Sequence, residues 1–319
     1  MNKYVGHDNQ IMGVEEVRLV GSKGEGLRLY QVRNGLGLEF TVNVDRCADI
    51  HRLSIGGVNC GFMSPCGWVA PAYYDKDGAF LDSFTAGFMT TCGLNNAGTD
   101  CVDDDEALPQ HGSITGVPAE NIYYYIDNNE IHIKAQMRDA KLFGTKMLLE
   151  REYVVSLDKN ELTINDKVTN IGDAPAPLML LYHCNMGYPL LSEDTEVKIP
   201  SVKVVGTSPR AEADIANCLT MEKPQAGYQE ECFFHTLEGK AEVSVINKKL
   251  GKGLIMKYDT AELPRFCEWK MMGEYDYVLG IEPGTTHPMG RPRCREAGFL
   301  ITLQPDESKK QSITFEFIG

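Results

Sequence analysis

The sequence predicts an all-β protein, built as a large antiparallel β-sandwich with few short helices. Two observations predict this class. Apolar and polar residues alternate over many short segments along the whole chain, which is typical of strands with one buried face. No stretch combines a sustained 3.6-residue apolar period with capping residues at both ends. The crossover helices that a parallel sheet requires are therefore not indicated.

Two hairpins carry the clearest alternation. Residues 130–137 place four apolar side chains on one face, and a polar turn at 127–129 joins them to the tyrosine-rich segment 121–126. A second hairpin is expected from residues 150–157 and 161–169, joined at 158–160. Further strands are expected over residues 27–32, 38–44, 241–247, 253–258, 277–281, 298–303 and 311–317. Residues 188–192 leave room for a short helix, and residues 172–177 are expected to form a loop between strands.

The length of 319 residues fits one large sandwich domain over residues 1–319. A hydrophobic fraction of 43% with 24% charged residues is ordinary for a globular protein, and no internal repeat or linker is visible. The chain holds no apolar run of about 18 residues, so no transmembrane helix is expected. Residues 1–13 lack a signal-peptide pattern, so we expect a cytoplasmic location.

The net charge of −14 argues against nucleic acid and anionic membrane surfaces as partners. It neither favours nor excludes a neutral sugar, and a local arginine cluster could still hold an anion. The ten cysteines are scattered without a Cys-x-x-Cys pair, which indicates reduced thiols in this compartment. No Cys and His residues cluster with ligand-like spacing, so we expect neither a metal site nor metal dependence.

Four regions are unusual for plain sandwich strands, because polar, aromatic and glycine residues gather in them. They are Asp-Arg-Cys-Ala-Asp-Ile at 45–50; Thr-Cys-Gly-Leu-Asn-Asn at 91–96 with Gln-His-Gly at 110–112; Tyr-His-Cys-Asn-Met-Gly at 182–187; and Glu-Trp-Lys at 268–270 with Ile-Glu-Pro at 281–283.

Three of these motifs resemble those of aldose 1-epimerases, and they occur in the same order. The segment at 182–187 resembles the His-bearing strand end, the one at 110–112 the preceding His-Gly motif, and the one at 281–283 the C-terminal Glu-Pro motif. Over nearly its full length the chain resembles a branch of the galactose mutarotase-like superfamily, the bacterial aldose 1-epimerase-like family of unknown function (DUF4432-type). The resemblance implies the supersandwich fold of that superfamily and a small-molecule sugar or sugar derivative as partner.

The chain also departs from the epimerases. They carry an arginine one strand before the first His, whereas no arginine lies between Arg52 and Gln110 here. Arg46 is the candidate replacement from another strand. Cys184 stands where an aromatic residue follows the second His in the epimerases, which implies a reshaped sugar pocket.

Interconversion of anomers needs a base for the proton of the anomeric hydroxyl and an acid for the ring oxygen, and no cofactor. The resemblance implies Glu282 as the general base, His183 as the general acid and His111 on the ring-oxygen side. Since a pyranose has to fit between them, we expect His183 and Glu282 not to touch. Weaker candidates for substrate contacts are Arg46, Asn185, Trp269, Lys270 and Arg291.

Structural roles stay open for these residues. His183 could be a satisfied core histidine, His111 a turn residue, and Glu282 an exposed or partnered carboxylate. Trp68 and Trp269 could stack on a sugar or pack in the core. The acidic residues 103–106 are expected to form a solvated loop rather than a calcium site. Alternation places Arg291, Arg293 and Arg295 on one face of a strand. They could clamp an anionic group of the substrate, but the favoured interpretation is a surface of ion pairs.

Two other functions also stay open. The first is a sugar-binding or sensing protein without turnover. The second is another carbohydrate isomerase or lyase on the same scaffold, because a fold does not determine a reaction. The oligomeric state is likewise open, and a homo-oligomer is compatible with the sequence.

Overall fold

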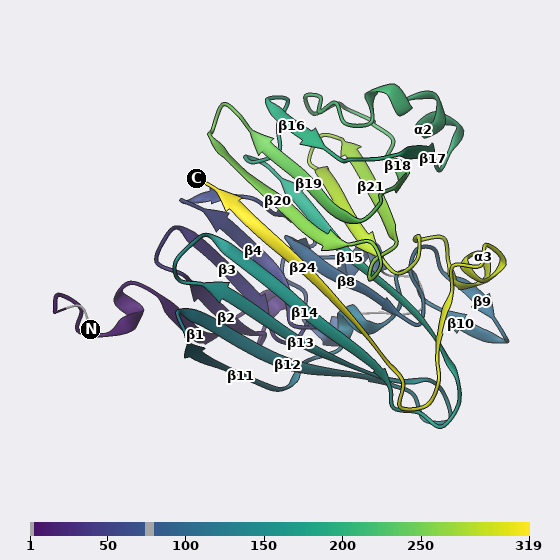
Figure 1. Cartoon of the computed structure of the whole chain (residues 1–319), viewed down its shortest axis with the longest axis horizontal. Coiled ribbons are helices and arrows are strands. Elements are labelled where there is room, and N and C mark those ends of the chain that lie inside the picture. Colours follow the sequence, from purple (N-terminus) through teal and green to yellow (C-terminus); the bar gives the residue numbers. More distant parts are fainter. Residues whose placement is uncertain (1–2, 74–79) are drawn as a thin grey trace.

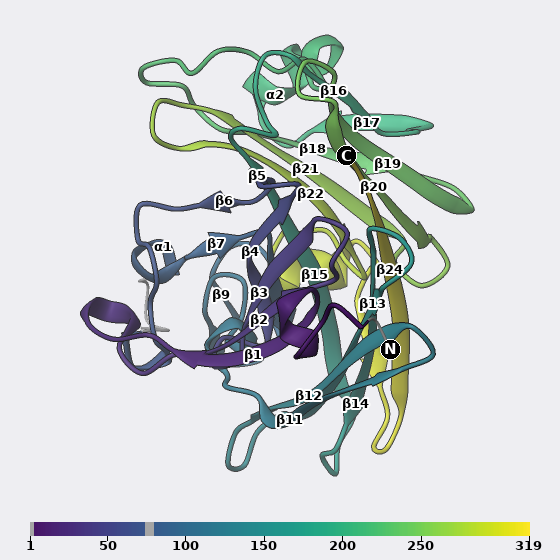
Figure 2. The ribbon, with the colours of Figure 1, turned by 90° about the vertical axis from the view of Figure 1, so that its left-hand side faces the viewer.

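The computed structural model describes residues 3–73 and 80–319. Two large sheets dominate it, and every pairing between their strands is antiparallel. In Figure 1 the sheets overlap, and Figure 2 shows β14 and β24 along one side of the molecule with β3 and β4 on the other. The predicted all-β antiparallel sandwich with few short helices is confirmed.

The larger sheet has twelve strands. Along its main path they are β1 (Gly13–Arg18), β2 (Arg28–Arg33), β3 (Leu38–Asn43), β4 (Asp49–Ile55), β8 (Met89–Leu94), β15 (Ala176–Gly187), β22 (Tyr277–Gly284), β21 (Arg265–Met272), β18 (Glu231–Thr236) and β17 (Lys203–Gly206). Two short strands join it at the side, β5 (Val58–Asn59) on β4 and β23 (Ile301–Leu303) on β15.

The second sheet has eight strands. In spatial order they are β11 (Glu120–Asp127), β12 (Glu130–Ala140), β13 (Lys146–Ser156), β14 (Glu161–Asn170), β24 (Ser308–Ile318), β20 (Lys252–Asp259), β19 (Lys240–Asn247) and β16 (Thr195–Lys198). Two-stranded ribbons add β9 (Cys101–Asp103) with β10 (Glu106–Leu108), and β6 (Phe62–Met63) with β7 (Ala86–Gly87). Both predicted hairpins are present, as β11–β12 and β13–β14.

Burial differs between the strands of the two sheets. Along β12, β13 and β14 buried residues alternate with half-buried ones, because one face meets the core and the other meets solvent. Every residue of β22 is buried, and so is almost every residue of β15. The outer face of these central strands is therefore covered by other parts of the chain, and a ligand site can form beneath that cover.

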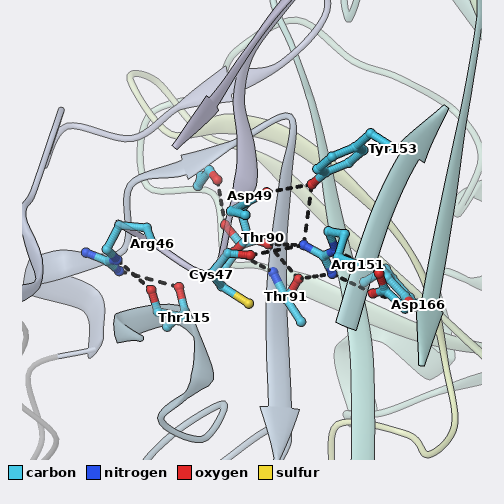
Figure 3. A network of polar contacts seen from close by, with 12 residues as sticks. Arg46, Cys47, Asp49, Thr90, Thr91, Thr115, Arg151, Tyr153 and Asp166 are labelled. Atoms are coloured by element: carbon cyan, nitrogen blue, oxygen red, sulfur yellow. Dashed lines mark hydrogen bonds and ion pairs between the residues drawn. The ribbon is translucent and has the colours of Figure 1, made fainter. Parts of the chain in front are cut away.

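A buried ion network connects the two sheets (Figure 3). Arg151 of β13 lies within hydrogen-bond distance of Asp166 on β14, of Asp49 on β4 and of Thr91 on β8. Asp49 also accepts hydrogen bonds from the backbone N–H and hydroxyl of Thr91, at 2.9 and 2.6 Å. Tyr182 of β15 donates to Asp166 at 2.8 Å. The network thus ties strands from both layers to one guanidinium group.

The helices of the described chain are short: α1 (Phe80–Ser83), α2 (Pro209–Ala213) and α3 (Arg291–Glu296). None of the helices in residues 3–73 and 80–319 is long and apolar enough to span a bilayer. The strand expected over residues 291–295 is wrong, because Pro292 occupies the first turn of α3, where its missing N–H costs nothing. Residues 188–192 form a turn rather than a helix.

Candidate functional site

His183 and Glu282 are direct neighbours on the covered face of the larger sheet. Leu181 lies opposite Gly284 and Cys184 opposite Ile281, so the register of β15 and β22 places His183 opposite Glu282. Their Nδ1 and Oε1 atoms are 3.1 Å apart. The expectation that the two side chains do not touch is wrong, because residues directly opposite in adjacent antiparallel strands share a face at close range.

The contact leaves the polar atoms of both side chains incompletely satisfied. Although His183 Nδ1 and Glu282 Oε1 are close, their angles do not meet hydrogen-bond geometry, and neither atom has another partner among the described residues. Both side chains are almost fully buried. Because buried polar atoms are nearly always hydrogen-bonded in folded proteins, such atoms beside a cavity indicate a place for a polar ligand.

His111 enters the same cavity from the loop that follows β10. Its backbone has φ +56° and is fixed by two hydrogen bonds, from its N–H to Gly98 and from the Gly93 N–H to its carbonyl. Its Nδ1 accepts the N–H of Gly98 at 3.3 Å, which assigns the ring proton to Nε2. The ring meets that of His183 edge-on at 5.5 Å. His111 is thus a positioned, neutral hydrogen-bond donor.

Aromatic rings surround His183 on two further sides. Trp269 of β21 lies edge-on to it at 5.2 Å, and Phe84, just after α1, lies 5.3 Å away. The indole N–H of Trp269 donates to Glu230 at 2.7 Å, which fixes the ring. Such rings are suited to the apolar face of a sugar.

The cavity enclosed by these residues has a volume of about 290 Å³. This volume is close to the lower end of small-molecule sites, roughly 300–1,000 Å³. His111, His183, Trp269 and Glu282 all line it, together with Glu230 and two thiols, Cys232 and Cys267. None of the described residues that line it is a lysine or an arginine.

Burial determines the charge state of the cavity. It raises the pKa of Glu282 well above the usual range, and the neighbouring Cys232 and Glu230 raise it further. It lowers the pKa of His183 to about 3, with His111 adding to the effect, and lowers the pKa of His111 to about 4. At neutral pH these directions favour a protonated Glu282 and two neutral histidines. The predicted roles, with Glu282 as base and His183 as acid, would require an ionised Glu282 and a protonated His183. The protonation favoured by burial is the reverse.

The other predicted contact residues do not line this cavity. Asn185 shares the face of His183, but its amide donates to the carbonyls of Gly87 and His183, at 3.2 and 2.9 Å. Lys270 neighbours Trp269 along β21 and therefore points to the opposite face, where its amine donates to the Asn217 carbonyl at 3.0 Å. The alternation of β21 alone could have separated Lys270 from Trp269.

Arg46 has a structural environment. Its guanidinium donates to the carbonyls of Thr115, Val69 and Ser83, which holds three segments around the buried turn before β4. Trp68 is also outside the cavity, and its ring lies tilted against that of His51, with 3.7 Å between the ring centroids.

Arg291 pairs with the acidic residues 103–106, which were expected to form a solvated loop but form the β9–β10 ribbon, with Asp103 buried. Its side chain contacts Asp103 at 2.5 Å and Glu106 at 3.2 Å, and Arg295 contacts Asp103 and Asp104. The favoured ion-pair interpretation is confirmed for Arg291 and Arg295, although Arg291 is buried rather than on the surface. The partners are almost 190 residues apart, so no sequence signal connected them.

Sequence reasoning missed Phe84, Glu230, Cys232 and Cys267 as lining residues. Cys267 could have been found, because it shares the strand face of Trp269 two residues away. Phe84 and Glu230 lie outside recognisable motifs, and only the packing of their loops places them here.

A larger groove of about 760 Å³ lies on the outer face of the eight-stranded sheet. Its charged side chains pair with one another, as Lys134 with Glu152 and Lys167 with Glu150. The groove lacks a buried acid and base with unpartnered atoms, such as Glu282 and His183 in the smaller cavity. The smaller cavity therefore remains the candidate site.

Comparison with known proteins agrees with this architecture. The chain is similar to a candidate aldose 1-epimerase from Klebsiella pneumoniae, with 24% identity, a TM-score of 0.92 and coverage of 98% of this chain and 86% of the other. It is also similar to a galactose mutarotase-like protein from Clostridium acetobutylicum (16%, TM-score 0.68, coverage 97% and 99%) and to galactose 1-epimerase from Lactobacillus acidophilus (15%, TM-score 0.67, coverage 97% and 99%).

At these identities the likeness shows the shared fold. No curated protein sequence matches the chain. The model of one family, described as a domain of unknown function (DUF4432), matches residues 24–317. The chain therefore belongs to the DUF4432 family and has the fold of the galactose mutarotase-like proteins.

Proposed function

We propose that this protein interconverts the anomers of a sugar by acid–base ring opening, with His183 and Glu282 as the proton-exchanging pair. One observation carries the proposal: a buried imidazole and a buried carboxyl group lie 3.1 Å apart on one face of a cavity, and each has a polar atom without a hydrogen-bond partner among the described residues. The galactose mutarotase-like fold and the order of the three motifs also support it.

The chemistry needs one acid and one base at the same time. One member of the pair takes the proton of the anomeric hydroxyl while the other gives a proton to the ring oxygen, so that the ring C–O bond breaks and a carbonyl forms. Ring closure on the other face of that carbonyl reverses both transfers. Burial favours Glu282 as the initial acid and His183 as the initial base. Ring opening moves one proton from Glu282 to the sugar and one from the sugar to His183, which leaves a basic Glu282 and an acidic His183 for ring closure, so the pair can operate in both directions.

The lining of the cavity supports an uncharged sugar as the substrate. Trp269 and Phe84 offer apolar faces, and His111 offers an N–H donor for a hydroxyl or ring oxygen. A phosphate or carboxylate would lie near Glu230 without a described lysine or arginine to pair with it, and burying an unpaired charge is costly.

The direct test is the rate of anomer exchange, measured by NMR over a panel of freshly dissolved aldoses. Glu282→Gln and His183→Asn should each lower turnover by roughly 10²–10⁴, the usual contribution of one general acid or base. The double variant should lose far less than the product of the two effects, because the groups act as a unit. His132→Asn, on β12 of the other sheet, is the matched control and should keep the wild-type rate. A Glu282→Gln protein that equilibrates every accepted sugar at the wild-type rate would refute the proposal.

The same measurement separates the alternatives. The direct contact between His183 and Glu282 favours a binding or sensing protein as the second candidate, because a sugar must lie above the pair rather than between its members. Binding of a sugar without faster anomer exchange would support that function. Formation of a new product, instead of a changed anomer ratio, would indicate another isomerase or a lyase.

A further inference from the structure

A second cluster of reactive side chains lies across the sheet from the cavity. Cys218, His235 and Glu268 are all buried, and one ligand atom of each lies within 4.8 Å of those of the other two. Glu268 precedes Trp269 on β21 and so points to the opposite face, where it meets His235 of β18 and Cys218, which follows α2 in the chain. We propose that these three residues bind a divalent transition metal ion of the zinc type. The proposal is independent of the sugar site.

The donor set fits such an ion in chemical type. Zinc in proteins is held by thiolate, imidazole and carboxylate groups, and three protein ligands with one open position are typical of reactive sites. Its metal–ligand bonds of about 2.0–2.3 Å place tetrahedral ligands about 3.3–3.8 Å apart. The ligand atoms lie within 4.8 Å of one another, so a shift of about 1 Å would bring the widest possible pair to that spacing.

Glu268 has an acceptor atom available for a ligand. Its side chain is fully buried, Oε2 is 2.9 Å from His235 Nε2, and the Cys218 thiol interacts with the carboxylate, but Oε1 has no hydrogen bond of good geometry among the described residues. A buried acceptor of this kind is costly unless a cation or a donor meets it. It is the observation, apart from the clustering itself, that points to a ligand here.

Ser201 holds His235 in the orientation that a metal ligand needs. Its hydroxyl lies 2.7 Å from Nδ1 of His235, on the far side of the ring from Glu268. Metal-binding histidines usually make such a hydrogen bond with their second nitrogen, because it fixes the tautomer and the ring plane. Nε2 would then carry the lone pair for the metal.

The cluster has charged neighbours of both signs. Lys270, on the same face of β21, acts on both Glu268 and Cys218 and opposes a bound cation, while Glu231 lies directly opposite Lys270 on β18. Glu231 also contacts Arg210 at 3.4 Å. A divalent ion would be neutralised by the Glu268 carboxylate and by the Cys218 thiolate, which forms as its proton is released to solvent.

Cobalt(II) is the probe for this site, because cobalt bound to a thiolate gives a charge-transfer band in the near ultraviolet. The intact protein should show the band at one cobalt per chain and lose it when zinc is added. Cys218→Ser and Glu268→Gln should abolish or strongly weaken it, whereas Cys232→Ser, which removes a thiol of the sugar cavity, should leave it unchanged. Absence of the band in the intact protein, or its persistence in Cys218→Ser, would overturn the proposal.

A second measurement needs no variant. Zinc should slow the alkylation of Cys218 in the folded intact chain at least tenfold, as read by peptide mapping, and leave the alkylation rate of Cys66 unchanged. Equal rates at Cys218 with and without zinc would also overturn the proposal.

Discussion

The buried network around Arg151 and the cavity around His183 differ in how well their polar atoms are satisfied. In the network, hydrogen bonds reach every nitrogen of the Arg151 guanidinium, and both carboxylates that face it are shared with a hydroxyl group. In the cavity, His183 Nδ1, Glu282 Oε1 and the nearby Asn185 Oδ1 have no hydrogen-bond partner among the described residues. The residues of the network and those of the cavity are both buried, and β15 of the larger sheet contributes to each, through Tyr182 and His183.

The difference separates scaffold from site. The hydrogen-bonded ionic network lies between the two sheets. It fixes how they pack, because movement of any one residue would leave the polar groups of its partners without hydrogen bonds. The unsatisfied atoms lie on the other face of the same sheet, beside a cavity, where an incoming ligand could complete them. Burial alone therefore does not identify a functional group, and unsatisfied hydrogen-bonding atoms that also line a cavity are the stronger indication.

Removal of Arg151 should produce the largest loss of stability. Arg151→Met leaves Asp49 and Asp166 buried without their cation, and breaking a buried pair in this way typically costs about 3–5 kcal/mol. Chemical denaturation of Arg151→Met should show that loss of unfolding free energy, or the variant should fail to fold. The matched control is Arg138→Met on β12, whose exposed pair with Glu120 should contribute less than about 1 kcal/mol. Equal losses for both variants would contradict a scaffold role for the network.

Acid should destabilise the protein through His183. Its pKa is lowered to about 3 by burial, so below its usual pKa of 6.5 the unfolded chain takes up a proton that the folded protein excludes. The stability that depends on the neutral ring is therefore complete above pH 6.5 and decreases as the pH falls toward 3, by at most about 1.4 kcal/mol per pH unit.

The His183→Asn variant isolates this contribution. The difference in unfolding free energy between wild type and His183→Asn, measured from about pH 7 to about pH 5, should shift against the wild type as the pH falls. Parallel curves would show that His183 is protonated in the folded protein and would remove the assignment of a neutral imidazole.

Glu282→Gln should have the smallest effect on stability and the opposite sign. Burial raises the pKa of Glu282, so near neutral pH the folded protein holds a proton that the unfolded chain releases, and this linkage lowers stability as the pH rises above 4.5. A neutral amide removes that cost. We expect the unfolding free energy of Glu282→Gln near neutral pH to equal that of the wild type or to exceed it by about 1 kcal/mol or more. Anomer exchange should be lost in the same variant. A loss of about 3 kcal/mol or more, the size expected for a broken buried pair, would place Glu282 with the scaffold instead.

Local features of the chain predicted the strands well. The period-two alternation of residues 130–137 and 311–317 and the polar turns at 127–129 and 158–160 lie where the structure places strands and hairpin turns. These signals depend on neighbours in sequence, since alternate side chains of a strand meet opposite environments. The motif order likewise identified His111, His183 and Glu282, which line one cavity together with Trp269, a weaker candidate.

Only the tertiary structure decided which distant residues meet. The contact of His183 with Glu282 follows from the register of β15 on β22, and register depends on the packing of whole strands and the loops between them. The same holds for the pairing of Arg291 with Asp103 and for the meeting of Cys218, His235 and Glu268. Residue type and spacing along the chain determined which side chains could carry chemistry. Their partners were determined by long-range strand pairing, which no local pattern encodes.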